Sequence, residues 1–315
     1  MSRPLDTLRT ATAGREAAGL RRTLRPRTPD HDGLIDLASN DHLGLSGDDR
    51  LIRAAVRATE DWGTGSTGSR LVTGTTLLHA ELEARLAAFT GAPGALVVTD
   101  AVFSVDGDLA PLRALHAAAV RHGALLMVDE AHSLGVVGES GRGAVHAAGL
   151  AGKSHIVRTV TLSKSLGSQG GAVLGAPEVI ETLIETGRSF IFDTGLAPAC
   201  VGAALCALEI LDERPELQKR ASAIARTLAA TARELGLESG GPAAAVVPIV
   251  LGPPGAAVSS ATLCAELGVR VGCFRPPSVP HGRSCLRLTA RANLGSDDLA
   301  VIRRALTAVA ERKVG

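Results

Sequence analysis

The sequence is poor in aromatic side chains: it has no tyrosine, one tryptophan and five phenylalanines among 315 residues. Base-stacking platforms for single-stranded nucleic acid depend on such side chains, so none is expected. The 33 basic and 32 acidic residues are scattered rather than grouped, and the net charge is +1. This balance predicts neither a nucleic-acid footprint nor a patch for an anionic membrane surface.

Long apolar runs and paired cysteines are missing too. No apolar run approaches the roughly 20 residues that cross a bilayer. Met1–Arg27 is rich in arginine and lacks the apolar region of a secretion signal, so none is expected. None of the five cysteines forms a C-x-x-C pair, which predicts reduced thiols and no metal site. We therefore expect a soluble, cytoplasmic protein.

The apolar pattern alternates between strands and helices in the first two thirds of the chain. Helical spacing covers Arg3–Thr23, Asp49–Trp62, Leu77–Thr90 and Pro111–His122. Strand candidates are Leu34–Ala38, Ala95–Val98, Ala124–Val128, Ile156–Thr161 and Ala172–Leu174. Such alternation predicts an α/β fold with a mostly parallel sheet and flanking helices.

The pattern changes beyond Leu196. Two helices and a smaller α+β unit follow: Ala199–Leu211, Glu216–Leu235, strands at Ala245–Leu251 and Leu286–Thr289, and a final helix Ser296–Arg312. We therefore expect an N-terminal arm (1–45), a large domain (46–212) and a small C-terminal domain (213–315).

Gly63-Thr64-Gly65-Ser66-Thr67-Gly68 matches the dinucleotide-binding fingerprint letter for letter. That fingerprint requires a strand before it and a helix opening at its end, whereas a helix is predicted before Gly63. We interpret the motif as a glycine loop that is flexible or contacts another subunit.

Asp129-Glu130-Ala131-His132 follows a predicted buried strand, at the end where open parallel sheets bind ligands. A carboxylate there can neutralise a protonated ring nitrogen, and His132 can reach the same ligand. An acidic pair of the ATPase type is the alternative, but the chain has no G-x-x-x-x-G-K-[ST] loop to hold phosphates.

Lys164 follows Asp129 by 35 residues, within Thr159-Val160-Thr161-Leu162-Ser163-Lys164-Ser165-Leu166-Gly167. A lysine among apolar and hydroxyl residues at a strand end is poorly placed for a surface charge. Desolvation lowers the pKa of a lysine and makes its amine a nucleophile toward an aldehyde. Thr161 and Ser163 are small donors suited to phosphate oxygens.

These two motifs together resemble the fold-type-I enzymes that use pyridoxal 5'-phosphate (PLP). Further motifs narrow the resemblance to the α-oxoamine synthase family: Leu37-Ala38-Ser39-Asn40-Asp41-His42-Leu43-Gly44-Leu45, Val102-Phe103-Ser104-Val105-Asp106-Gly107-Asp108 and Gly138-Glu139-Ser140-Gly141-Arg142-Gly143. The resemblance implies the PLP-dependent transferase (aspartate-aminotransferase-like) fold.

The resemblance also implies roles for single residues. Lys164 would carry the cofactor and transfer the proton, and Asp129 would pair with the pyridinium nitrogen. The other implied cofactor contacts are His132 and Ser104 beside the phenolic oxygen, Thr161 at the phosphate, and Thr194 at the phosphate of the neighbouring subunit, which implies a homodimer with shared sites.

Substrate residues are implied in the same way. Asn40 and Arg287 would bind the amino acid carboxylate, and Arg21 would lie near the acyl substrate. His42 stands where the family usually has tyrosine, and we expect little consequence from that change.

Two segments, Arg275-Pro276-Pro277-Ser278-Val279-Pro280-His281-Gly282 and Leu286-Arg287-Leu288-Thr289, resemble most the members that condense L-alanine with a pimeloyl thioester. The alternatives are glycine C-acetyltransferase, 5-aminolevulinate synthase and a catalytically dead dimeric homologue.

The resemblance is interrupted after Val97. A family member would continue into a serine-glycine-aromatic turn, a helix and a histidine-bearing loop, but this chain passes directly to Val98 and Thr99. About 70 residues are absent, roughly two βαβ units. They would include the amides that cradle the cofactor phosphate and the histidine that stacks on its ring. Either the segment is deleted, which a packed core should not tolerate, or the sequence joins two stretches of a longer chain.

Overall fold

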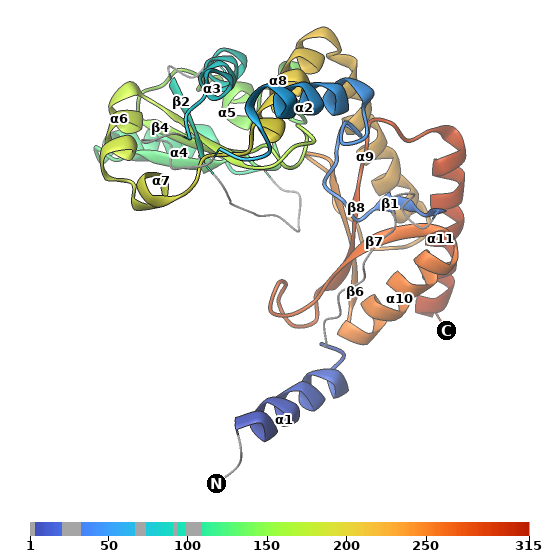
Figure 1. The fold of residues 1–315 in the computed structure, drawn as a ribbon. Helices are drawn as coiled ribbons and strands as arrows, with labels where there is room; N and C mark the ends of the chain where they lie inside the picture. The colour runs from blue at the N-terminus through green and yellow to red at the C-terminus, as the bar shows by residue number, and fades with distance from the viewer. Residues whose placement is uncertain (1–3, 21–32, 67–73, 91–93, 99–108, 315) are drawn as a thin grey trace.

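The computed structural model describes residues 4–20, 33–66, 74–90, 94–98 and 109–314. Within them the strands form two four-stranded sheets, one in each of two lobes (Figure 1). The strand orders are β2-β5-β4-β3 and β1-β7-β8-β6. At the predicted interruption, Val97 and Val98 are consecutive in the strand Gly94–Val98, and Thr99 lies outside the described residues.

The first sheet contains β2 (Gly94–Val98), β3 (Leu126–Asp129), β4 (Ile156–Thr161) and β5 (Gly171–Gly175). β3 and β4 are parallel, whereas β5 is antiparallel to both β4 and β2, so three of the four strands share one direction. The reversal of β5 departs from the predicted parallel pattern. It arises because only residues 162–170 join β4 to β5, too few for the crossover that a parallel pair needs.

Helices α2 (Asp49–Trp62), α3 (Leu77–Thr90) and α8 (Pro198–Glu213) pack together against this sheet. Ten of the sixteen residues of α8 are buried, so this helix is apolar almost all round, as expected for one enclosed by others. The shorter elements of the lobe are α4 (Leu112–Arg121), η2 (Glu139–Gly141), α5 (Ala144–Ala147), α6 (Pro177–Thr186) and α7 (Arg188–Phe192).

The second sheet contains β6 (Val246–Gly252), β7 (Val269–Phe274), β8 (Ser284–Thr289) and β1 (Ile35–Leu37). β1 comes from the predicted N-terminal arm, yet it pairs in parallel with β7 in the C-terminal part of the chain. Helices α9 (Glu216–Glu234), α10 (Pro254–Glu266) and α11 (Ser296–Val314) pack on one side of this sheet around a second apolar core (Figure 1). α1 (Pro4–Ala17) extends away from both lobes.

Several predicted elements are confirmed with their bounds, among them Asp49–Trp62, Leu77–Thr90 and Ile156–Thr161. Strand β7 and helix α10 were not predicted. Alanine, serine and glycine dominate α10, and β7 mixes Arg270 and Gly272 with its apolar residues, so neither shows a clear apolar period.

β3 lies at one end of its sheet, and no strand among the described residues pairs with its outer edge. Met127, on the same face of β3 as Asp129, is 70% exposed, Leu125 just before the strand is 58% exposed, and Leu115 and Val120 of the adjacent α4 are exposed as well. Residues 124–128 contain no charge and no proline, the usual protections of an edge strand. An open apolar edge agrees with the predicted absence of strands from this part of the chain.

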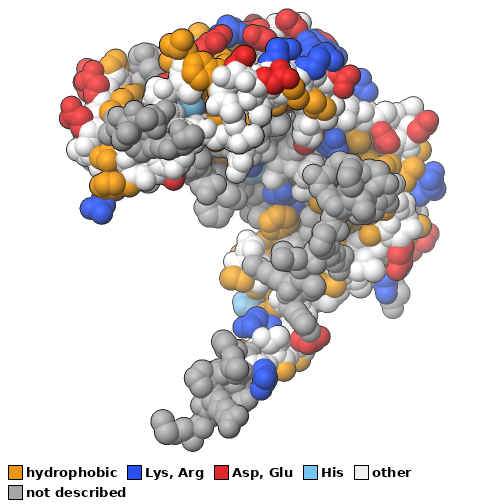
Figure 2. Space-filling model, in the orientation of Figure 1, with side chains coloured by type: hydrophobic (Ala, Val, Ile, Leu, Met, Phe, Trp, Pro, Cys, Tyr) orange, Lys and Arg blue, Asp and Glu red, His pale blue; other side chains and the backbone are white. Residues whose placement is uncertain are grey.

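Basic and acidic side chains are interspersed over the face of the molecule shown in Figure 2. None of the described helices has both the length and the apolar character needed to span a bilayer. The described part of the chain also holds no group of three His, Cys, Asp or Glu residues arranged to bind a metal ion.

Candidate active site

Three loops meet where the two lobes join, and each follows the carboxyl end of a strand. They are residues 38–46 after β1, 130–138 after β3, and 162–170 after β4. Gly167 shows how closely two of them pack: its φ is +58°, and a Cβ there would lie 3.1 Å from the backbone nitrogen of Ser46. The loop after β3 contacts the loop after β1 through the rings of His132 and His42, whose centroids are 5.9 Å apart.

Lys164 lies in the loop after β4 and is 6% exposed. Its Nζ makes no hydrogen bond with any described residue. Burial lowers the pKa of Lys164 to about 8; nearby Asp129 opposes the change, and Arg287 adds to it. The sequence prediction of a desolvated, nucleophilic lysine is consistent with this environment.

Asp129 ends β3 beside this amine, and its Oδ1 accepts a hydrogen bond of 2.8 Å from the backbone N–H of Ala131. This local turn fixes the carboxylate at the end of the strand. The side chain is exposed, so Oδ2 remains open to a ligand from solvent. The structure thus brings Asp129 and Lys164 together, as the spacing of the two motifs predicts.

His132 and His42 face each other with their ring planes at 60°. Burial is the largest cause that lowers the pKa of each ring to about 3. Lys164 and Arg287 add to the effect at His132, and His132, Arg287 and Lys164 add to it at His42. Both rings are therefore neutral at physiological pH, and Nδ1 of His132 has no hydrogen-bond partner among the described residues.

We predict that His42 makes the protein sensitive to acid. The unfolded chain binds a proton at His42 below pH 6.5, whereas the folded chain does so only near pH 3. Stability is therefore lost as the pH falls through this window, by about 3 kcal/mol between pH 6.5 and 4. Urea unfolding of the wild type and His42→Tyr at pH 7, 6, 5 and 4 measures this. The wild type should lose more stability than the variant, and equal losses would contradict the prediction.

Arg287 in β8 and Asn40 after β1 form the second part of the site, although 247 residues separate them. Nη2 of Arg287 donates a hydrogen bond of 2.8 Å to Oδ1 of Asn40. The guanidinium carbon of Arg287 lies 4.7 Å from the centre of the Phe274 ring, a cation–π contact that holds its plane. Burial lowers the pKa of Arg287, and Cys285 opposes this. The predicted pair is thus together in space.

The loop that carries Asn40 is fastened at both ends. Oδ1 of Asp36 accepts hydrogen bonds from the backbone N–H groups of Ala38 and Ser39, at 2.9 and 3.1 Å. Nη2 of Arg291, beyond β8, lies 3.4 Å from Oδ2 of Asp41. These contacts couple the position of Asn40 to the end of the strand that holds Arg287.

Thr161 is buried at the end of β4, where its Oγ1 lies 2.7 Å from Oγ of Ser163. The two hydroxyls form a small polar patch beside the Lys164 loop, consistent with a phosphate contact.

Two predicted site residues, Arg21 and Ser104, lie outside the described residues. Thr194 is exposed and is not brought to the Lys164 cluster; its backbone N–H bonds to Oδ1 of Asp193 within its own loop. The Gly63–Gly68 motif is preceded by α2, as predicted, which excludes the strand that a dinucleotide fingerprint requires. Oγ of Ser66 donates to the carbonyl of Leu196.

Sequence reasoning missed several residues that shape the site. Phe274 beneath Arg287 lies in the unpredicted strand β7. Arg158 lies in the otherwise apolar and hydroxyl run of β4, where it forms a buried ion pair with Glu130. A charged residue in a buried strand needs a buried partner of opposite charge, so Arg158 within this run could have indicated the ion pair.

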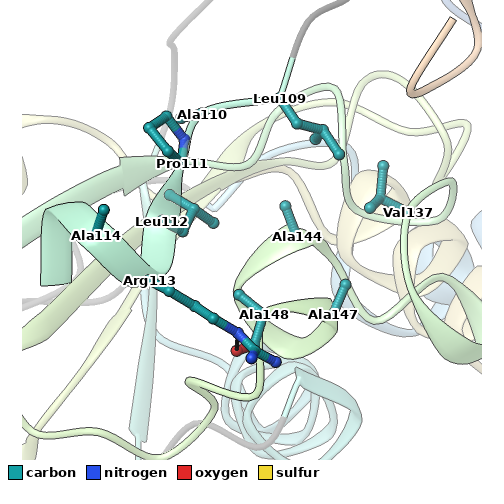
Figure 3. A pocket seen from close by; sticks show the side chains of 10 residues that line it. All are labelled: Leu109, Ala110, Pro111, Leu112, Arg113, Ala114, Val137, Ala144, Ala147 and Ala148. Atoms are coloured by element: carbon teal, nitrogen blue, oxygen red, sulfur yellow. Dashed lines mark hydrogen bonds between the residues drawn. The ribbon is translucent and has the colours of Figure 1, made fainter. Parts of the chain in front are cut away.

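A separate cavity of about 420 Å³ lies between the start of α4 and α5 (Figure 3). Its walls are mostly alanine and leucine side chains, and Nε of Arg113 at its edge donates to the carbonyl of Ala148. None of the predicted site residues lines it.

Comparisons with known proteins show the family and the fold. The pattern of the aminotransferase class I and II family matches residues 91–306. The 8-amino-7-oxononanoate synthase of Mycolicibacterium vanbaalenii is 46% identical over 374 residues, spanning 97% of each chain. Since 97% of 315 residues is about 306, about 68 aligned positions have no residue in this chain. This agrees with the predicted loss of about 70 residues.

Solved structures share the fold. Serine palmitoyltransferase from S. paucimobilis, with a bound PLP–myriocin aldimine, has a TM-score of 0.88 at 24% identity and covers 98% of both chains. The 8-amino-7-oxononanoate synthase of Francisella tularensis has a TM-score of 0.72 at 21% identity, covering 89% of this chain and 98% of that one. The predicted PLP-dependent transferase fold is confirmed. The chain belongs to the aminotransferase class I and II family and, within it, to the α-oxoamine synthases.

Proposed function

We propose that this chain is a PLP-dependent acyltransferase that joins L-alanine to a pimeloyl thioester with loss of carbon dioxide. This is the reaction of 8-amino-7-oxononanoate synthase, a cytoplasmic step of biotin biosynthesis. The acyl carrier is coenzyme A or a carrier protein. The observation that carries the proposal is Lys164, a buried amine beside Asp129 and the Arg287–Asn40 pair. The relative that is 46% identical supports the choice of reaction.

The described residues fit the proposed cofactor. A buried amine with no hydrogen-bond partner suits the aldehyde of PLP, and the Asp129 carboxylate suits its pyridinium nitrogen. The neutral ring of His132 can bond to the phenolic oxygen, and Thr161 can donate to the phosphate. When bound, PLP supplies the electron sink for the carbanion that forms when alanine loses its α-proton.

Each side chain of the site then has a separate role in the proposed reaction. The Arg287 guanidinium binds the alanine carboxylate through two parallel hydrogen bonds, and Asn40 keeps it oriented. Nζ of Lys164, once free, takes the α-proton and later returns it. Asp129 holds a proton on the ring nitrogen, and the position of Lys164 in the junction of the two lobes shields the exchange from water.

A contact between two distant segments supports the proposed binding region for the acyl substrate. Nη1 of Arg275 donates to the carbonyl of Gly19, which joins the chain just before Arg21 to the segment that begins at Arg275. Arg21 remains a predicted contact of the acyl substrate.

We also propose a homodimer with shared active sites. Thr194 is exposed next to Phe192, which is 74% exposed, and such an apolar side chain suits a subunit interface. We also propose three parts of the chain: an arm (1–45), a large domain (46–212) and a small domain (213–315). Strand β1 links the arm to the small domain by pairing with β7.

Two measurements test the proposal. Intact mass of the natural protein comes first: a mass well above 32.1 kDa would mean that the segment missing after Val97 exists. A turnover panel of alanine, glycine and serine against pimeloyl, acetyl and succinyl thioesters follows. Turnover of alanine with pimeloyl thioester is expected. Preference for glycine with acetyl or succinyl thioester would instead favour glycine C-acetyltransferase or 5-aminolevulinate synthase.

The pH dependence of PLP capture provides an independent prediction. Only the neutral amine attacks an aldehyde, so the rate should rise with pH and level off above about pH 8. An ordinary lysine, with a pKa near 10.5, would have roughly 300-fold less neutral amine at pH 7. Stopped-flow absorbance between pH 6 and 10 measures the midpoint. No capture at any pH would favour a catalytically dead homologue.

A further inference from the structure

Glu130 and Arg158 form an ion pair that the proposed mechanism does not use. Nη1 of Arg158 lies 3.2 Å from Oε2 of Glu130, and the two side chains are 3% and 0% exposed. Burial lowers the pKa of Arg158, and Glu130 opposes this change. The Glu130 carboxylate also accepts hydrogen bonds from Oγ of Ser133 and the backbone N–H of Val145, at 3.1 and 2.9 Å. Two charges removed from water in this way are stable only together.

The pair lies on the opposite face of the sheet from the active site. Asp129 is paired in register with Thr159, and Val128 with Arg158. Because side chains alternate along a strand, Asp129 and Thr161 share one face, and Arg158 points to the other, where it meets Glu130. From there Nη2 of Arg158 reaches the carbonyl of Thr90, at the end of α3.

Glu130 also forms the turn that carries the site residues. Its backbone carbonyl accepts the N–H groups of Ser133 and Leu134, at 2.9 and 3.0 Å, and this turn holds His132. Gly143 leaves room for the carboxylate: its φ is +101°, and a Cβ there would lie 2.5 Å from Oε1 of Glu130. A change at Glu130 therefore moves the residues on both sides of it.

This support matters because β3 is an edge strand. β4 holds it on one side, and its other side has no partner strand among the described residues. The hydrogen bonds to β4, the packing of Leu126 and Val128 on a buried apolar cluster, and the Glu130–Arg158 pair then restrain β3.

We propose that Glu130 and Arg158 are positioning residues, which hold Asp129 and His132 at the open edge of the sheet in the geometry that the cofactor needs. The inference rests on the proposed function for its consequence in PLP binding, but the restraint itself exists in the cofactor-free chain.

The test compares Glu130→Gln, Arg158→Met and Arg158→Lys with a matched control, Arg85→Met. Arg85 forms a shorter ion pair with Asp212, 2.7 Å, whose two side chains are partly exposed at the surface. Hydrogen exchange of the cofactor-free protein, followed by mass spectrometry, is read for the peptide 126–137 and for peptides of the second sheet. PLP affinity and the ratio of the absorbance bands of the bound cofactor are measured on the same proteins.

We expect Glu130→Gln and Arg158→Met to speed exchange in 126–137 about tenfold, with the second sheet unchanged. PLP affinity should fall about tenfold with an altered band ratio, and Arg158→Lys should recover part of both losses. Glu130→Gln nearly preserves shape and keeps the test informative should Arg158→Met fail to fold. Exchange equal to that of the control, or faster exchange everywhere, would overturn the inference. If the wild type binds no PLP, only the proposed function is refuted. The positioning role of Glu130 and Arg158 is still decided by hydrogen exchange of the cofactor-free protein.

Discussion

Replacement of Lys164 with alanine is expected to abolish covalent attachment of PLP and to lower kcat/KM by at least about 10⁴-fold. The reason is chemical: Lys164 is the buried amine of the site, and its burial lowers its pKa to about 8. Borohydride reduction followed by mass spectrometry should find the added cofactor on the wild type and not on Lys164→Ala. Lys164→Arg should fail in the same way, because a guanidinium keeps the charge but is no nucleophile.

Lys153→Ala is the matched control, because Lys153 is exposed and eleven residues upstream. It should retain full attachment. The cofactor-free Lys164→Ala protein should unfold at no lower urea concentration than the wild type at pH 7, since the replaced amine is buried without a hydrogen bond. Attachment of PLP to Lys164→Ala at the wild-type level would show that another amine carries the cofactor.

Replacement of Arg287 with leucine is expected to lower kcat/KM for alanine by about 100-fold or more, mainly through KM. Arg287 is buried, bonds to Asn40 and packs over Phe274, so its plane is fixed before substrate arrives. Arg287→Lys should restore little, because an ammonium group lacks the two parallel donors. Asn40→Ala should lower kcat/KM for alanine about tenfold, because the guanidinium of Arg287 remains but loses its hydrogen bond to Asn40.

The control for this series is Arg283→Leu. Arg283 lies just before β8, is about half exposed and forms only a 3.9 Å pair with Glu238. Steady-state kinetics with varied alanine should leave this variant unchanged. PLP attachment should survive in all four variants, since none of the replaced groups lies in the Lys164 loop. An unchanged KM for alanine in Arg287→Leu would remove Arg287 from the substrate site.

The local motifs were the easiest part of the site to predict. Asp129 is the last residue of one strand and Lys164 follows its neighbour, and the ends of neighbouring parallel strands meet at one edge of a sheet. The helices with clear apolar spacing, such as α2 and α3, were predicted for the same reason. The pairing of Asn40 with Arg287 followed only from the family resemblance, because nothing in the local pattern joins residues 247 apart.

Other features depended on contacts that no local pattern encodes. β1 lies in the second sheet because β7 offers it an edge, although the chain places it before the first lobe. β5 runs against its neighbours because its connection to β4 is short. The fold also buries His42 against His132, and burial keeps both rings neutral; the sequence did not indicate this contact.

By itself, the sequence predicted three groups for the chemistry, Asp129, His132 and Lys164, each at or just after the end of a strand, whereas Arg287, inside β8, followed from the family resemblance. Residue type and strand-end position decide this locally, through desolvation and the direction of the chain. Only the tertiary structure decided how these groups are held. The ion pair of Glu130 with Arg158 and the contact of Phe274 with Arg287 join segments far apart in the chain. Their energies depend on burial, which is a property of the packed fold and not of any single segment.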